Sequence, residues 1–199
     1  MKNDHIAALT GGISTGKSTV SKYFQEYFGF HLVDADKIGH KVLSLPQTIA
    51  QISDEFGPNV IDNETVNRKI LGQIVFGDKN KLKKLNEITH PVLIKEAFRV
   101  LEKLNDKPVI FEAAILIEAG WHKHFKKIIL TTCSPEIQLA RTMVRNSLSQ
   151  EDAQKRINAQ VSDRTRSQHS DFIIDTSLGL NPVKAQLDMI ANTLLKEIR

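Results

Sequence analysis

The sequence lacks the features that disulfide-stabilised, secreted or membrane-spanning proteins need. Its 199 residues include a single cysteine, Cys133, so no disulfide can form within the chain. No apolar run approaches the roughly 20 residues required to cross a bilayer. The first residues, MKNDH, do not have the layout of a signal peptide. We therefore expect a cytoplasmic protein without a membrane partner, in which Cys133 is a small core or strand-end residue.

Aromatic residues are also scarce, at 6% of the chain, and the net charge of +4 is dispersed along it. A nucleic-acid-binding surface normally combines clustered basic and aromatic side chains, so we expect no nucleic-acid partner. A polyphosphorylated small molecule explains the same basic excess. The histidines do not have the spacing of zinc ligands. The remaining composition, 41% hydrophobic and 25% charged, is that of an ordinary soluble globular protein. A length of 199 residues suits one α/β domain with insertions.

What the sequence does contain is a phosphate-binding loop near its start. Residues 11–18 read GGISTGKS and match the pattern G-x-x-x-x-G-K-S/T. The apolar run at 6–9 predicts the strand that must precede such a loop, and apolar residues from Val20 onward recur at helical spacing. The alternative, a glycine-rich turn before an amphipathic helix, rarely arrives with both flanking elements present.

Each part of this loop has a physical role. Glycines let the backbone N–H groups point at phosphate oxygens, and the following helix adds its positive dipole end. Lys17 is expected to reach the terminal phosphates, and the Ser18 hydroxyl to ligate Mg²⁺. The residues predicted to bind ATP here are Gly12, Ile13, Ser14, Thr15, Gly16, Lys17, Ser18 and Thr19.

Five short apolar runs predict the strands of one parallel sheet. They span residues 6–9, 31–33, 109–111, 127–131 and 172–174. Amphipathic helices, including 182–198, would cover the sheet. The predicted fold class is therefore α/β, with a P-loop NTPase-type parallel five-stranded sheet flanked by helices.

Acidic residues follow two of the predicted strands. Asp34 and Asp36 come after 31–33, and Glu112 comes after 109–111. Ligands bind at the carboxyl ends of strands in parallel α/β sheets, so these acids are placed for chemistry. Asp34 could equally cap the helix that follows it. For Asp36 we favour a functional role. Glu112 should lie beside the phosphate loop if the sheet is wound in the usual order.

Between the second and third strands, residues 37–96 carry helical patterns at 48–56, 68–75 and 79–88, without clear β alternation. We interpret them as an α-helical insertion that, by analogy with similar folds, carries the acceptor substrate. A further helix is predicted over 95–104, ending at Asn105-Asp106-Lys107-Pro108. The predicted core is then 1–36 with 97–133 and 159–199.

Residues 134–158 predict a helical hairpin that could act as a lid. Ser134 and Ser149 are natural N-caps, the first with Pro135 at the first helical position. Arg141 and Arg145 are four residues apart and share one helix face. They could close over ATP phosphates and exclude water, or they could be ordinary surface residues; both interpretations stay open at this point.

Over nearly its whole length the sequence resembles the dephospho-coenzyme A kinase family. The phosphate loop is common to many families, but several other motifs at these intervals are more specific. The shared motifs are LTGGISTGKST at 9–19, VDAD at 33–36, FG at 56–57, NRKIL at 67–71, VF at 75–76, THP at 89–91, ILIEAG at 115–120, SPEIQLARTMVR at 134–145, RINAQ at 156–160 and SDFIID at 170–175.

The resemblance implies phosphorylation of the ribose 3′-hydroxyl of 3′-dephospho-CoA by ATP with Mg²⁺, the last step of coenzyme A synthesis. It implies three regions: the core, a coenzyme A domain at 37–96 and the lid. It implies that Asp36, Lys17 and Arg141 are catalytic and that Arg145 binds ATP. It also implies that Ser18 and Asp34 hold the metal ion, directly or through water. The positions it implies for acceptor binding are Thr10, Asp36, Arg68, His90 and Glu118.

This sequence departs from the family pattern at a few positions. The family loop usually reads GGIGSGKS, whereas Ser14 and Thr15 stand here; a positive φ at Ser14 would be strained. Ala114 and Thr176 replace a usual proline and asparagine.

A nucleoside or nucleotide kinase is the alternative activity. A nucleotide-dependent switch would need a GTP-selective motif of the N-K-x-D type, and a nucleic-acid-binding module would need clustered basic and aromatic residues. We find neither in the sequence. We expect a monomer or weak homo-oligomer.

Overall fold

The computed structural model describes residues 5–75, 77–104 and 107–197. By its internal contacts the chain forms two compact units. The first unit comprises Met1–Asp34 and Leu104–Arg199, and the second comprises Ala35–Lys103. The predicted core ended at 36 and resumed at 97, so Asp36 falls in the second unit rather than in the core.

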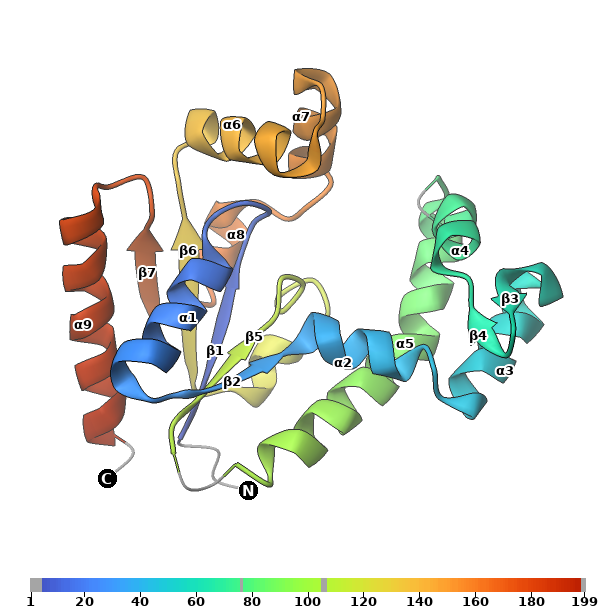
Figure 1. The fold of residues 1–199 in the computed structure, drawn as a ribbon, viewed down its shortest axis with the longest axis horizontal. Helices are drawn as coiled ribbons and strands as arrows, with labels where there is room; N and C mark the ends of the chain where they lie inside the picture. Colours follow the sequence, from blue (N-terminus) through green and yellow to red (C-terminus); the bar gives the residue numbers. More distant parts are fainter. Residues whose placement is uncertain (1–4, 76, 105–106, 198–199) are drawn as a thin grey trace. The chain divides into compact units, whose positions relative to one another are not determined.

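The first unit is built on a five-stranded parallel sheet in the order β2-β5-β1-β6-β7 (Figure 1). All five strands expected from the apolar runs are confirmed, each ending one or two residues later than predicted. The central strand β1 is buried throughout, which explains its continuous apolar run. The strands are β1 (Ile6–Gly11), β2 (His31–Asp34), β5 (Val109–Glu112), β6 (Lys127–Thr132) and β7 (Phe172–Asp175).

Two helices cover one face of this sheet, α1 (Lys17–Phe28) and α9 (Leu180–Glu197) (Figure 1). Helical spacing on α1 turns Val20 and Phe24 toward the sheet, where both are buried. The Tyr23 hydroxyl donates a 2.8 Å hydrogen bond to Asp188 and joins the two helices. The buried cluster between the helices and the sheet contains Ala7, Leu9, Val20, Phe24, Phe30, Ile110, Ile129, Ile174, Leu187, Ile190, Ala191 and Leu194.

Successive strand side chains alternate between faces, so Phe111 points away from this cluster. Its ring stacks on Phe125, with 5.0 Å between the centroids. Phe125 follows the short 3-10 helix η2 (Trp121–His124). The helix α8 (Asp163–Ser167) packs against β6. Phe125 and α8 therefore pack on the second face.

A helical hairpin follows β6, made of α6 (Pro135–Asn146) and α7 (Gln150–Asn158). It lies beyond the carboxyl ends of the strands (Figure 1). Both predicted N-caps are confirmed: Ser134 accepts from the Ile137 amide and Ser149 from the Asp152 amide. Cys133 sits between β6 and this hairpin, half-buried, and desolvation by its surroundings is the main cause that raises the pKa of its thiol.

The second unit is mainly helical, as predicted, with its own apolar core. Its buried residues are Ile52, Val60, Val66, Leu71 and Val75. The elements are α2 (Ala35–Val42), α3 (Pro46–Phe56), the 3-10 helix η1 (Pro58–Val60), β3 (Ile61–Asp62), β4 (Thr65–Val66), α4 (Arg68–Val75) and α5 (Lys79–Leu101).

Two expectations for this unit need correction. The antiparallel pair β3–β4 was missed, because two residues per strand are too few to give an alternating pattern. Its turn residues Asn63 and Glu64 have φ angles of 47° and 60°. The helices predicted over 79–88 and 95–104 are one helix, α5, which contains Pro91. A proline forgoes one backbone hydrogen bond, but burial of the helix beyond it keeps α5 continuous.

The predicted domain limit at residue 96 therefore lies inside α5. Phe76 of the VF motif, the turn residues Asn105 and Asp106, and Ile198 of the predicted last helix lie outside the described residues. Across the described ranges, no helix combines the length and apolarity that a membrane crossing requires.

We predict that Phe24→Ala lowers the free energy of unfolding by about 3–5 kcal/mol, because it empties a fully buried site in the main cluster. Gln25→Ala changes an exposed neighbour on the same helix and should stay within about 0.5 kcal/mol of the starting protein. Urea denaturation followed by circular dichroism measures both. Equal losses for the two variants would contradict the assignment of this cluster as the core of the first unit.

Candidate active site

The loop between β1 and α1 bends in a way that two of its glycines require. A Cβ atom at Gly11 would lie 2.5 Å from the backbone oxygen of Thr131 on the neighbouring strand. Gly16 has a φ of 93°, and a Cβ there would lie 3.2 Å from Thr176 Cγ2. Larger residues would therefore push the loop off β6 and off the segment after β7.

Ser14, at the tip of the same loop, has a φ of 60°. Ser14 is one of the departures from the family pattern, and its backbone therefore has the positive φ that is strained for a serine. For a residue with a side chain, the left-handed conformation costs about 1–2 kcal/mol. Ser14 is only 9% exposed, and its buried Oγ has no hydrogen-bond partner among the described residues.

The loop is preformed by contacts among its own residues. Lys17 Nζ donates to the carbonyl oxygens of Gly11 and Gly12, each at 2.8 Å. The Thr15 hydroxyl lies 2.9 Å from the Gly12 carbonyl oxygen and 2.8 Å from the Thr131 hydroxyl. A mobile lysine whose charge rests on the loop carbonyls can exchange them for phosphate oxygens.

Side chains from outside the loop also hold it in place. The Ile13 amide donates to Gln160 Oε1 at 2.7 Å, and Gln138 Nε2 donates to the Ile13 carbonyl at 2.9 Å. The Thr176 hydroxyl donates to the Thr15 carbonyl at 2.9 Å. Sequence reasoning singled out neither glutamine, although both lie in the motifs that carry the family resemblance. No local pattern marks a glutamine that contacts a loop more than 100 residues away.

Glu112 lies beside the phosphate loop, as the sheet order predicted. Its carboxylate accepts from the Ser18 hydroxyl at 3.2 Å and from the Ser21 hydroxyl at 2.7 Å. Glu112 is in register with Asp34 on β2, so two carboxylates end adjacent strands. Hydroxyl and carboxylate oxygens are the donors that Mg²⁺ prefers. No group of three or more His, Cys, Asp or Glu side chains forms a metal cage in the described part of the chain.

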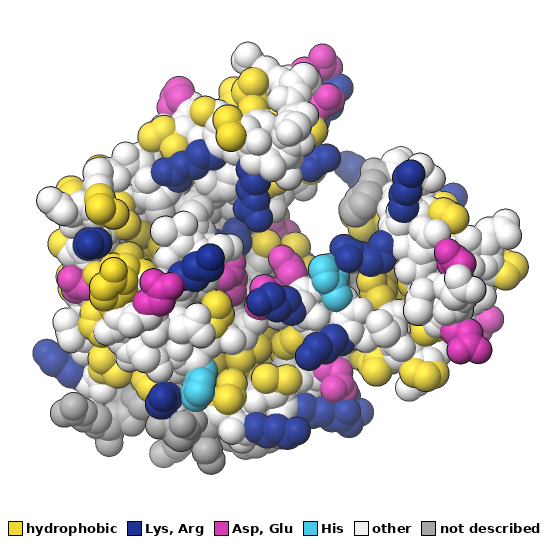
Figure 2. Space-filling model, in the orientation of Figure 1, with side chains coloured by type: hydrophobic (Ala, Val, Ile, Leu, Met, Phe, Trp, Pro, Cys, Tyr) yellow, Lys and Arg dark blue, Asp and Glu magenta, His cyan; other side chains and the backbone are white. Residues whose placement is uncertain are grey.

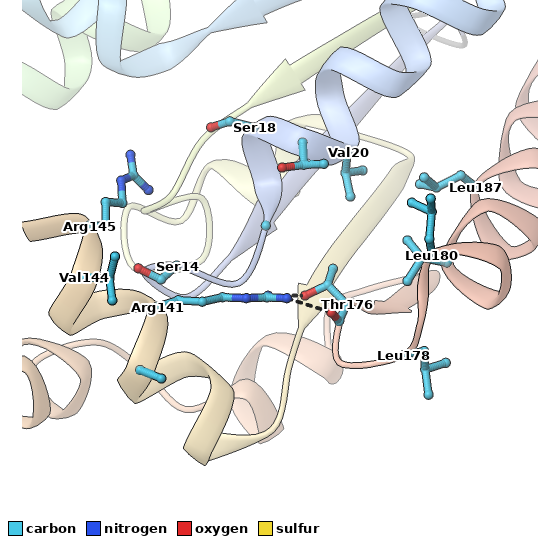
Figure 3. A pocket seen from close by; sticks show the side chains of 14 residues that line it. Ser14, Ser18, Val20, Arg141, Val144, Arg145, Thr176, Leu178, Leu180 and Leu187 are labelled. Atoms are coloured by element: carbon cyan, nitrogen blue, oxygen red, sulfur yellow. Dashed lines mark hydrogen bonds between the residues drawn. The ribbon is translucent and has the colours of Figure 1, made fainter.

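A cavity of about 800 Å³ opens beside the loop (Figure 3). One side is polar, with the loop, Arg141 and Arg145, and the other is apolar. Figure 2 shows Lys and Arg side chains on this face just below α6. The cavity therefore combines a basic wall with an apolar one. Its lining is Ser14, Gly16, Ser18, Thr19, Val20, Ala140, Arg141, Val144, Arg145, Thr176, Leu178, Leu180, Val183 and Leu187.

The two hairpin arginines occupy different settings in this cavity. Arg141 donates to the Thr176 hydroxyl at 2.9 Å and to the Thr176 carbonyl at 3.0 Å (Figure 3). It thereby ties α6 to the segment after β7. Arg145, one helical turn further along α6, lines the same cavity. Both cations thus reach the cavity from α6.

A buried arginine that sequence reasoning did not single out lies close to Gly12. Arg166 is 2% exposed and forms an ion pair with Glu118 at 2.8 Å. It also donates to Asp163 at 3.2 Å and to the Val161 carbonyl at 2.6 Å. A guanidinium with several paired donors can be buried at tolerable cost. Glu118, predicted to bind the acceptor, is thus engaged with Arg166.

The other predicted site residues divide between the two units. Thr10 is fully buried in β1, and its hydroxyl has no partner among the described residues. Asp36 is exposed in the first turn of α2, the position where a carboxylate complements the helix dipole. Arg68 begins α4, and His90 lies in α5, where burial lowers the pKa of its imidazole. These last three residues belong to the second unit.

Known proteins share both the sequence and the fold. A model of the dephospho-CoA kinase family matches residues 5–181. The dephospho-CoA kinase of Dehalococcoides mccartyi is 36% identical over 195 residues, covering 96% of this chain and 98% of the relative. That of Fusobacterium nucleatum is 37% identical over 190 residues, covering 95% and 98%.

Solved structures agree with these matches. A dephospho-CoA kinase structure from Campylobacter jejuni has a TM-score of 0.62 at 26% identity, covering 96% of this chain and 97% of that one. A Thermus thermophilus structure at 24% identity has a TM-score of 0.80 and covers 98% and 97%, which supports the fold. The matched segment includes the phosphate loop, the second unit and the α6–α7 hairpin. The chain therefore belongs to the dephospho-CoA kinase family.

Proposed function

We propose that this chain transfers the terminal phosphoryl group of ATP to the ribose 3′-hydroxyl of 3′-dephospho-CoA, forming coenzyme A and ADP. The observation that carries the proposal is the extent of the family match, residues 5–181. The match includes the whole second unit, Ala35–Lys103, and not only the phosphate loop that many kinases share. A nucleoside or nucleotide kinase would share the loop but not this match.

The nucleotide is proposed to occupy the cavity beside the loop. Its apolar wall, which includes Val20, Val183 and Leu187, suits a base and sugar. The basic wall and the loop amides suit a triphosphate. Lys17 would leave the carbonyls of Gly11 and Gly12 and follow the charge that develops on the transferred group. In this setting the α6–α7 hairpin acts as a lid through Arg141 and Arg145.

The residues present also suit Mg²⁺. The Ser18 hydroxyl already lies 3.2 Å from Glu112 Oε1, and Asp34 is in register with Glu112. Ser18 would contact the ion, and Asp34 and Glu112 would act directly or through water. When bound, Mg²⁺ would supply charge that neutralises part of the negative charge of the phosphates.

The acceptor step is proposed to use Asp36. The 3′-oxygen attacks the γ-phosphorus, the bond from that phosphorus to the bridging oxygen breaks, and its electron pair leaves with ADP. The hydroxyl proton passes to the Asp36 carboxylate. An ordinary carboxylate suffices because the transition state is largely dissociative. Asp36 also fixes the direction of the attacking oxygen. Thr10, Arg68, His90 and Glu118 are the further positions proposed to serve the acceptor.

The first test compares acceptors. We expect ADP release coupled to product formation with 3′-dephospho-CoA, and at most trace turnover with adenosine or AMP, in the presence of ATP and Mg²⁺. Lys17→Ala serves as the inactive reference, because the lysine acts on the transferred charge rather than on packing. Preferential turnover of AMP or adenosine would replace the acceptor assignment with that of a nucleotide or nucleoside kinase.

The second test concerns the proton acceptor. Asp36→Asn should lower kcat by about 10²–10⁴-fold while ATP binding persists, which is the usual cost of losing a general base. Asp34→Asn should have a milder effect if that residue caps α2 or supports the metal through water. Asp54→Asn, at an exposed position of α3, is the matched control. Normal turnover by Asp36→Asn would move the role to Asp34 or Glu112.

The third test separates a lid from an ordinary surface hairpin. Arg145→Ala should raise the KM for ATP roughly 10-fold or more, as expected for loss of one bond to a charged group, with little change in Tm. Arg141→Ala should lower both ATP affinity and Tm, because it also loses two bonds to Thr176. Arg164→Ala is an exposed control on α8. Early unfolding with normal kinetics per folded molecule would make the hairpin arginines structural.

A further inference from the structure

The two peptide groups that flank Ile13, in the phosphate loop, are held by glutamines at the two ends of the α6–α7 hairpin. Gln138 Nε2, near the start of α6, donates to the Ile13 carbonyl oxygen at 2.9 Å. Gln160, two residues after the end of α7, accepts from the Ile13 amide at 2.7 Å. These bonds join positions 125 and 147 residues apart. The hairpin therefore contacts the loop both where it begins and where it ends (Figure 1).

The first of these peptide groups lies between Gly12 and Ile13. Its carbonyl oxygen accepts from Lys17 Nζ at 2.8 Å and from the Thr15 hydroxyl at 2.9 Å, while its N–H donates to Gln160. When Lys17 exchanges this oxygen for a phosphate oxygen, the peptide group loses one of its hydrogen bonds. The bond to Gln160 remains and keeps the peptide group from rotating.

The second peptide group lies between Ile13 and Ser14. In a trans peptide the C=O and the N–H point in opposite directions. The bond from Gln138 to the Ile13 carbonyl therefore turns the Ser14 N–H away from that glutamine. The Gln138 amide also lies against the neighbouring glycine, because a Cβ at Gly12 would be 2.7 Å from Nε2. This close approach fixes where the loop lies relative to α6.

Gln138 shares one face of α6 with the two arginines of the cavity. Residues three and seven positions apart lie on the same side of a helix, which places Gln138, Arg141 and Arg145 in one row. Arg141 bonds to Thr176 from this row, and both arginines line the cavity. Because α6 is one rigid helix, the contact of Gln138 with the loop also sets the position of both cations.

We propose that Gln138 and Gln160, the glutamine pair, are positioning residues for phosphoryl transfer. They hold the loop amides and the arginine-bearing face of α6 at one spacing, so a phosphoryl group on the loop meets the arginines without rearrangement. This inference rests on the proposed function, because it takes the cavity to be the ATP site. The pair contacts Ile13 rather than the phosphates. It therefore acts mainly on the rate of transfer, through alignment, and less on nucleotide affinity.

The directions of the two bonds predict opposite results for the same substitution. Gln160→Glu keeps an oxygen that accepts from the Ile13 N–H, so kcat should stay close to that of the starting protein. Gln138→Glu replaces a donor by an acceptor facing the Ile13 carbonyl. Its kcat should fall about 10-fold or more, with a smaller change in the Kd of a non-hydrolysable ATP analogue. Gln138→Met and Gln160→Met cannot form the bonds, and both should lower kcat.

Gln154→Glu is the matched control on the same hairpin. Gln154 is exposed on α7 and its Nε2 bonds to Asn158, so this variant should leave kcat and Kd unchanged. Circular dichroism gives the Tm and the folded fraction of each variant, and kcat is expressed per folded molecule. Equal kcat for Gln138→Glu and Gln160→Glu would overturn the proposal. Losses that disappear after correction for the folded fraction would overturn it as well.

A double-mutant cycle tests the spacing between loop and hairpin. Once Gln138→Met has removed the contact of α6 with the loop, Arg145→Ala should lower kcat/KM for ATP by a smaller factor than it does in the starting protein. Independent losses that multiply would mean that Gln138 acts on the loop alone, and the proposed coupling to the arginines would be wrong.

All variants are assayed with the acceptor that the starting protein uses, which separates this inference from the proposed reaction. Turnover of AMP or adenosine in place of 3′-dephospho-CoA would overturn the proposed acceptor, and the glutamine pair would be judged by the same variants with that acceptor. Absence of phosphoryl transfer from ATP to any of the three would overturn both proposals.

Discussion

Backbone amides can bind phosphate only while the loop that carries them keeps one bend, and the rest of this site depends on that bend. A Cβ at Gly11 would collide with Thr131, and a Cβ at Gly16 would be tight against Thr176 at a positive φ that favours glycine. Hydrogen bonds from Gln138 and Thr176, and one to Gln160, then hold the loop from outside. These supports come from three segments distant in the sequence, so the loop conformation is a property of the whole first unit. Preorganisation of this kind lets the amides act on developing charge without rearrangement at the moment of reaction.

Charge in the site is arranged around the same bend. Lys17 rests on the loop carbonyls, which keeps a cation near the phosphate position. Glu112 engages Ser18 and Ser21 at the start of α1, and its register with Asp34 sets two carboxylates at one edge of the sheet. The buried Arg166 pairs with Glu118 rather than standing as a bare charge. Lys17 thus lies on the phosphate loop, and two carboxylates lie beside it at the position that we propose for Mg²⁺.

The two units carry different residues of the phosphoryl transfer that we propose. The first carries the phosphate loop, the cavity and the α6–α7 hairpin, whereas the second carries Asp36, Arg68 and His90. The continuity of α5 through Pro91 matters here, because one helix of 23 residues replaces two short ones in the frame of the second unit. A proline near the middle of a long packed helix removes one hydrogen bond, and the apolar contacts of Leu93, Ala97 and Leu101 outweigh that loss.

The sequence by itself determined the parts of this protein that depend on local patterns. Apolar runs predicted all five strands, the G-x-x-x-x-G-K-S/T spacing predicted the phosphate loop, and Ser134 and Ser149 marked the helix starts, because each feature is written within a few consecutive residues. Only the tertiary structure decided the rest. The Arg166–Glu118 ion pair and the glutamine contacts to Ile13 join segments distant in the sequence, and burial keeps α5 unbroken. The β3–β4 pair has strands of two residues each, too short to give a sequence pattern. Burial and long-range hydrogen bonding override local preference there, and no spacing along the chain encodes which side chains will meet.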